Sequence, residues 1–65
     1  MVKINDIKEQ SRFCLNLMEK LNKEIHNAEL DYNVIKHHYR MTMDILRIRR
    51  ELITLKNMLM NYIKV

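Results

Sequence analysis

The side chains that most often carry chemistry are few in this chain: its only cysteine and histidines are Cys14, His26, His37 and His38. His37 and His38 are adjacent, so on a helix they point to different faces and cannot bind one metal ion together. His26 and Glu29 stand three residues apart and offer two ligands, fewer than a closed metal site requires. A catalytic Cys–His pair needs a third group to orient the histidine, and none stands out. The sequence therefore predicts no enzymatic activity, no metal site and no cofactor.

The composition narrows the class of protein further. The 65 residues include no Gly and no Pro, which excludes the glycine-rich loops that bind phosphate groups. Charged residues make up 31% of the chain and no apolar run approaches 18 residues, so we expect no membrane insertion. Lys3, Asp6, Lys8 and Glu9 interrupt the N-terminal stretch where a signal peptide would be apolar. A cytoplasmic location is the resulting expectation.

Two rows of apolar residues, spaced mainly by three and four, indicate two amphipathic helices. The first row is Ile4, Ile7, Cys14, Met18, Leu21, Ile25 and Ala28. The second row is Met41, Ile45, Ile48, Leu52, Leu55, Leu59 and Tyr62. The rows are out of phase, because extending the first into the second half would place Arg49 and Lys56 in the core, which is costly. The sequence therefore favours two helices over one.

These rows predict an all-α fold, an antiparallel two-helix hairpin in a single domain, residues 1–65. We expect the first helix at about 3–27, the turn at about 28–33 and the second helix at about 34–63. Asn27 or Asn33 can adopt the left-handed backbone conformation of the turn, and Asp31 is a suitable N-cap for the second helix. A three-helix bundle and a continuous coiled coil remain as alternatives.

The apolar content exceeds what a hairpin seam can bury. Ordering 65 residues costs about 1.5 kcal/mol each, and one seam between two helices cannot offset that cost. The sequence therefore predicts a homo-oligomer, most simply a homodimer in which two hairpins form a four-helix bundle. The length and the inferred hairpin resemble, in architecture alone, the small dimeric four-helix bundles.

A second interpretation assigns the surplus apolar residues to an open groove for another protein. Flexible, polarizable methionine side chains suit adaptable binding surfaces of this kind. The candidate partner-binding residues are Phe13, Leu17, Met58, Met60 and Tyr62.

The positive charge is concentrated in the second half of the chain. Residues 1–33 carry five basic and six acidic side chains, whereas residues 34–65 carry seven basic and two acidic ones. Lys36, Arg40, Arg47 and Arg50 share one side of the second helix. Such a row can contact nucleic-acid phosphates or an acidic protein partner. It can also be a solvated surface with local ion pairs, Arg40 to Asp44 and Arg47 to Glu51.

Together these features predict a small non-enzymatic protein–protein interaction module that regulates, inhibits or scaffolds a partner protein. Its partners are itself and another protein. The alternative is a nucleic-acid-binding regulator that uses the basic side of the second helix.

Overall fold

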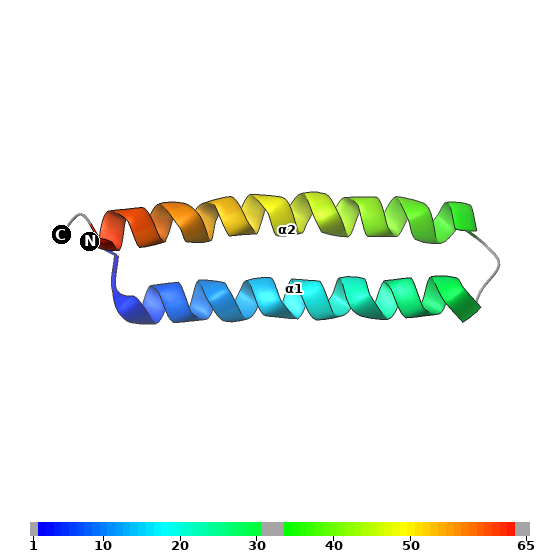
Figure 1. Ribbon diagram of the computed structural model, residues 1–65, viewed down its shortest axis with the longest axis horizontal. Helices are drawn as coiled ribbons and strands as arrows, with labels where there is room; N and C mark the ends of the chain where they lie inside the picture. The colour runs from blue at the N-terminus through cyan, green and yellow to red at the C-terminus, as the bar shows by residue number, and fades with distance from the viewer. Residues whose placement is uncertain (1, 31–33, 64–65) are drawn as a thin grey trace.

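The computed structural model describes residues 2–30 and 34–63, which form two helices. Helix α1 spans Ile4–Leu30 and helix α2 spans Val34–Ile63. Figure 1 shows the two helices side by side and antiparallel, with the start of α1 and the end of α2 at the same end of the molecule. The predicted all-α hairpin is confirmed. A three-helix bundle and a continuous coiled coil are excluded, because neither helix breaks and the two pack against each other.

The observed ends of the helices differ from the predicted ones at one place. Helix α1 ends at Leu30, three residues beyond the predicted boundary, so Asn27 is helical and is not a turn residue. Helix α2 covers the predicted range. Asp31 and Asn33, the other predicted turn and capping residues, lie outside the described part of the chain.

The start of α1 is capped by its own side chains. The backbone N–H of Lys3 donates to the Asp6 carboxylate at 3.1 Å. In return, the backbone N–H groups of Asp6 and Ile7 donate to the carbonyl of Lys3. The Lys3 N–H to Asp6 bond is one half of a capping box, with Asp in the place of the usual Glu or Gln, and the Lys3 side chain has no acceptor for the other half. The Asp6 carboxylate also puts a negative charge at the positive end of the helix dipole.

The helices meet along a seam whose residues alternate in spacing between three and four, as in an antiparallel coiled coil. On α1 the buried and half-buried seam residues are Ile7, Gln10, Cys14, Leu17, Leu21, Glu24 and Ala28. On α2 they are His37, Met41, Asp44, Ile48, Glu51, Leu55 and Met58. Five of these fourteen residues are polar, so the seam is less apolar than the sequence rows suggested.

Polar pairs cross the seam at two positions along its length. We call two residues that face each other across the seam a level. The Gln10 side-chain amide donates to the Glu51 carboxylate at 2.9 Å and to the Glu51 backbone carbonyl at 3.0 Å. Farther along, Nδ1 of the buried His37 lies 2.6 Å from Oε1 of Glu24. Within the described residues no buried side-chain nitrogen or oxygen lacks a hydrogen-bond partner. These pairs satisfy their own polar groups and fix the register of the hairpin.

Apolar levels alternate with the polar ones. In the register set by the two polar pairs, Cys14 lies level with Ile48 and Leu21 lies level with Met41. Cys14 is the most buried residue in the seam, with 2% of its surface exposed, and it is a free thiol. A small buried apolar side chain was the structural role predicted for it.

The predicted seam is wrong in its rotation. Half of the residues in the two predicted rows lie in the seam. The others are exposed on the surface: Ile4, Met18 and Ile25 of the first row, and Ile45, Leu52, Leu59 and Tyr62 of the second. The physical reason is that the polar seam residues find partners across the hairpin, so their burial is tolerated. Apolar residues at the positions beside the seam are thereby left exposed on both helices.

The hairpin is long and thin, measuring 51 × 15 × 11 Å. Its radius of gyration is 15.0 Å, against about 11 Å for a compact domain of this length. Its accessible surface is 5530 Å², whereas a compact monomer of 8.0 kDa exposes about 4,500 Å². The single hairpin therefore exposes roughly 1,000 Å² more than a self-contained domain does.

Candidate interaction faces

One side of the hairpin carries exposed apolar side chains from both helices, and we call this side the apolar face. It consists of Ile4, Met18 and Ile25 of α1 with Ile45, Leu52 and Leu59 of α2, and Ser11 interrupts the row on α1. Each helix repeats these positions every seven residues, directly beside its seam. The six apolar residues are between 39% and 53% exposed.

Contacts on the opposite side show that these two rows share one face. Phe13 and Lys20, which flank the α1 seam on one side, reach Arg47 and Asp44 of α2. Because the helices are antiparallel, the other flanks of the two seams must then lie together on the reverse side. In the observed register Ile4 lies level with Leu59, and Met18 lies level with Ile45.

A shallow groove runs along the α2 half of the apolar face. Ile45, Ile48, Leu52 and Ile53 line it, and the long side chains of Arg49 and Lys56 border it. Such stems cover apolar surface while their charged ends stay in water. The groove is therefore apolar along its length and positively charged at its edge.

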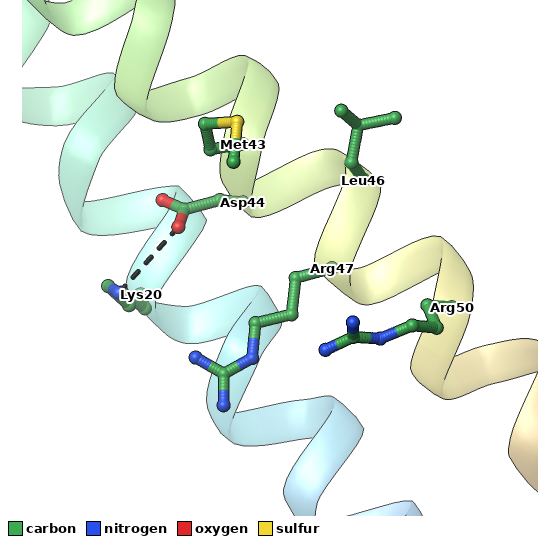
Figure 2. A pocket seen from close by; sticks show the side chains of 6 residues that line it. All are labelled: Lys20, Met43, Asp44, Leu46, Arg47 and Arg50. Carbon is green, nitrogen blue, oxygen red and sulfur yellow. Dashed lines mark ion pairs between the residues drawn. The ribbon is translucent and has the colours of Figure 1, made fainter.

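The reverse side of the hairpin, which we call the basic face, carries most of the predicted cationic residues. The predicted row is Lys36, Arg40, Arg47 and Arg50, and Lys20 of α1 joins it. Figure 2 shows a hollow on this face lined by Lys20, Met43, Asp44, Leu46, Arg47 and Arg50. The Lys20 ammonium lies 3.6 Å from the Asp44 carboxylate, and the Arg47 side chain extends from α2 toward α1.

The ion pairs of the basic face differ from the predicted ones. Arg40 pairs with Glu24 across the hairpin at 4.0 Å, and not with Asp44 on its own helix. Arg50 lies 3.8 Å from the Glu51 carboxylate. The carboxylates occupy seam positions, so they face the other helix and not the next turn of α2. The long side chains of the cationic residues on the basic face extend to these carboxylates. The pairs are Lys20 with Asp44, Arg40 with Glu24, and Arg50 with Glu51.

Arg47 is held in a different way. Its guanidinium carbon lies 5.5 Å from the centre of the Phe13 ring, which is a cation–π contact. In the part of the chain that the structure describes, no carboxylate pairs with Arg47. The guanidinium is therefore fixed in direction by an aromatic ring while its charge remains available.

The predicted partner-binding residues do not form one groove. Leu17 lies in the hairpin seam with 8% of its surface exposed, and Met58 is a half-buried seam residue. Phe13 is half-buried on the basic face, beneath Arg47. Met60 and Tyr62 are exposed near the end of α2. Binding of a partner at these residues stays a prediction, and it applies most directly to Met60 and Tyr62.

Sequence reasoning missed two features of these faces. It assigned Ile45, Leu52 and Leu59 to the hairpin core, because Asp44 and Glu51, the seam residues one position earlier, look like surface residues when α2 is considered alone. It also missed that Phe13 and Lys20 of α1 complete the basic face, because that depends on how the two helices pack.

Other candidate sites have no support among residues 2–30 and 34–63. No group of three or more His, Cys, Asp or Glu side chains there is arranged to hold a metal ion. Neither described helix combines the length and the apolar character that crossing a bilayer requires. Comparison with protein-family models, curated proteins and solved structures finds no match for this chain.

Proposed function

We propose that this chain is a non-enzymatic protein–protein interaction module. Two copies join their apolar faces to make a homodimeric four-helix bundle, and the bundle regulates, inhibits or scaffolds a partner protein. The observation that carries the proposal is the exposed apolar face formed by both helices. We place the protein in the cytoplasm, where the reducing conditions suit the free Cys14 thiol.

The size of the exposed surface supports a second copy as the occupant of the apolar face. A standard protein–protein interface buries about 800 Å² on each partner. The hairpin exposes roughly 1,000 Å² more than a compact monomer of its mass, so covering one face removes the excess. A two-fold symmetric pair also lets one apolar surface meet an identical one.

The small core of the single hairpin also supports self-association. The buried apolar residues among those described are Ile7, Cys14, Leu17 and Ile48. A core of this size supplies little net stability to a chain of 65 residues. Pairing the apolar faces would add six large side chains per copy to the buried set.

Surfaces that remain open in such a dimer are available to another protein. Leu46 and Met60 lie on the outer side of α2, away from the apolar face, and are about half exposed. The basic face lies on the reverse side of each hairpin. The alternative function, a nucleic-acid-binding regulator, would use that basic face as well, and a duplex-DNA probe separates the two.

A matched pair of substitutions on α2 tests the proposal. Ile45 is 53% exposed and Leu46 is 52% exposed in the single hairpin, so glutamate should be tolerated equally at both if the hairpin is monomeric. In the proposed dimer only Ile45 lies at the centre of the interface. We therefore expect Ile45→Glu to convert the dimer to monomer, and Leu46→Glu to leave it intact, in size-exclusion chromatography with light scattering.

The partner half of the proposal is tested with the same variants. A protein captured from the native host should be lost when Met60 and Tyr62 are replaced by Ser and Ala, while the dimer persists. If the wild-type chain is a stable, folded monomer, the proposed self-association is wrong. If a host protein is still captured after nuclease treatment, and changes at Met60, Tyr62 and the basic face leave its capture unaffected, the partner binds at none of the assigned surfaces.

A further inference from the structure

We infer that the hollow on the basic face binds an acidic amphipathic helix of a partner protein, with Arg47 as its anchoring cation. This inference rests on the proposed function, because it names the chemistry of the partner that the interaction module takes. Three features of the hollow carry it: a pre-positioned arginine, exposed apolar side chains beside it, and carboxylates recessed beneath it.

Arg47 is prepared to accept a carboxylate. Its guanidinium is held against the Phe13 ring, and no carboxylate of the described residues pairs with it. A planar guanidinium binds a carboxylate through two parallel hydrogen bonds. Because the ring already restricts the side chain, less conformational entropy is lost when a partner binds.

The hollow is apolar as well as basic. Met43 is 49% exposed and Leu46 is 52% exposed, and both line the same hollow as Arg47 and Arg50. Figure 2 shows Leu46 extending from the outer side of α2 while Arg47 extends toward α1. A nucleic-acid backbone gains nothing from these apolar side chains, whereas an amphipathic protein helix would bury them.

The charges of the hollow also favour a protein helix over a duplex. The Asp44 side chain is only 15% exposed and is paired with Lys20, and Glu51 lies at 3.8 Å from Arg50. A duplex would bring closely spaced phosphates over these two carboxylates, since it carries one charge per about 1.7 Å. Acidic residues one helical turn apart are spaced about 5–6 Å, which matches Arg47 and Arg50 at i and i+3.

The test uses fluorescence anisotropy at low salt with three labelled probes. The first is a synthetic peptide of about four helical turns, roughly 15 residues, with Glu on one face and Leu beside it. The second is a peptide of the same composition with its helical periodicity scrambled. The third is a duplex DNA of about the same length as the peptide helix. We expect the amphipathic peptide to bind at least tenfold more tightly than either of the other two.

Two substitutions in the hollow locate the binding. Arg47→Gln should weaken binding of the amphipathic peptide by about tenfold, the loss of one charge-assisted contact. Arg12→Gln, the matched control, removes the same charge from an exposed position on the outer side of α1 and should change binding less than twofold. Leu46→Ser should weaken peptide binding by about fivefold and leave DNA binding unchanged.

Each other outcome counts against the inference. Equal binding of the scrambled peptide, or equal loss with Arg12→Gln, would mean that net charge alone attracts the probe. Tighter binding of the duplex would assign the face to nucleic acid. No binding of the amphipathic peptide would overturn the inference outright. Measuring the mass of the protein in the same samples shows whether the dimer of the proposed function is present, so the two failures are distinguishable.

Discussion

The seam inside the hairpin and the apolar face outside it differ in a way that reverses the usual arrangement of a small protein. The seam buries Gln10, Glu24, His37 and Glu51 in partnered polar levels. The apolar face, a quarter turn away on each helix, exposes isoleucine, leucine and methionine instead. The buried region is therefore more polar than one of the exposed regions.

The difference indicates that the two regions have separate roles. Polar levels contribute little net stability but strongly disfavour any shift of one helix along the other, because a shifted seam would bury unpaired groups. An apolar face has no such selectivity but contributes a large gain when it is covered. The seam thus specifies how the chain folds back on itself, and in the proposed dimer the apolar face provides the energy of association.

The largest expected effect comes from a charge on the apolar face. In the proposed dimer, Leu52→Asp buries a carboxylate without a partner, so the dissociation constant should rise at least 100-fold, about 3 kcal/mol. Sedimentation equilibrium measures the constant directly. Leu46→Asp, at a similarly exposed leucine on the outer side of α2, is the control and should leave the constant unchanged. If Leu52→Asp and Leu46→Asp raise the dissociation constant equally, the apolar face does not differ from the outer side of α2 in its role in association.

A second prediction concerns a variant in which one polar level of the seam is replaced by apolar residues. Replacing both partners of one polar level, Gln10→Leu with Glu51→Leu, should raise the free energy of unfolding by about 2 kcal/mol. The single change Gln10→Leu should instead lower it by about 1 kcal/mol, because Glu51 loses the hydrogen bond that it accepts across the seam. Urea unfolding at one fixed protein concentration compares the three proteins. A double variant less stable than the single one would show that the polar level stabilises the hairpin.

A third prediction concerns the one polar gap in the apolar face. Ser11 lies level with Leu52, and Ser11→Leu should tighten the dimer about fivefold, about 1 kcal/mol. Asn16→Leu adds a leucine at an exposed position of α1 that lies away from the apolar face. Its effect on association should be close to zero. If the two substitutions strengthen association equally, general hydrophobicity is the cause and not this face.

The smallest expected effect is at the ion pair of the hollow. Lys20 is largely exposed, with 64% of its side-chain surface accessible, so its attraction to Asp44 is screened by water and salt. Lys20→Gln should lower the free energy of unfolding by less than about 0.5 kcal/mol. A loss of several times that size in thermal or urea unfolding would mean that the basic face contributes to folding and not only to binding.

The hairpin itself could be predicted from the sequence, because its cause is local. Spacings of three and four identify each helix, and the change of phase between the two rows separates them. The end of α1 was less predictable, since without Gly or Pro no residue forces the helix to stop. Asn27 was a permitted turn residue, but helical geometry accommodates it equally well.

The rotation of the helices could not be predicted, because its cause is non-local. Gln10 and Glu51 are 41 residues apart, and each looks like a surface residue when its own helix is considered alone. Helix α2 also has apolar residues on several sides, so its pattern alone does not select the side that meets α1. The basic row was predictable as a helical row, whereas the contributions of Phe13 and Lys20 to that face depend on tertiary packing.

The mass of the wild-type protein in solution tests the central claim most directly. Sedimentation equilibrium at micromolar concentration should report twice the chain mass of 8.0 kDa, with helical circular dichroism that declines as dilution dissociates the dimer. A mass of 8.0 kDa, with full helicity that does not depend on concentration, would show that the hairpin is stable alone. The apolar face would then have no claim to be the surface that joins two copies.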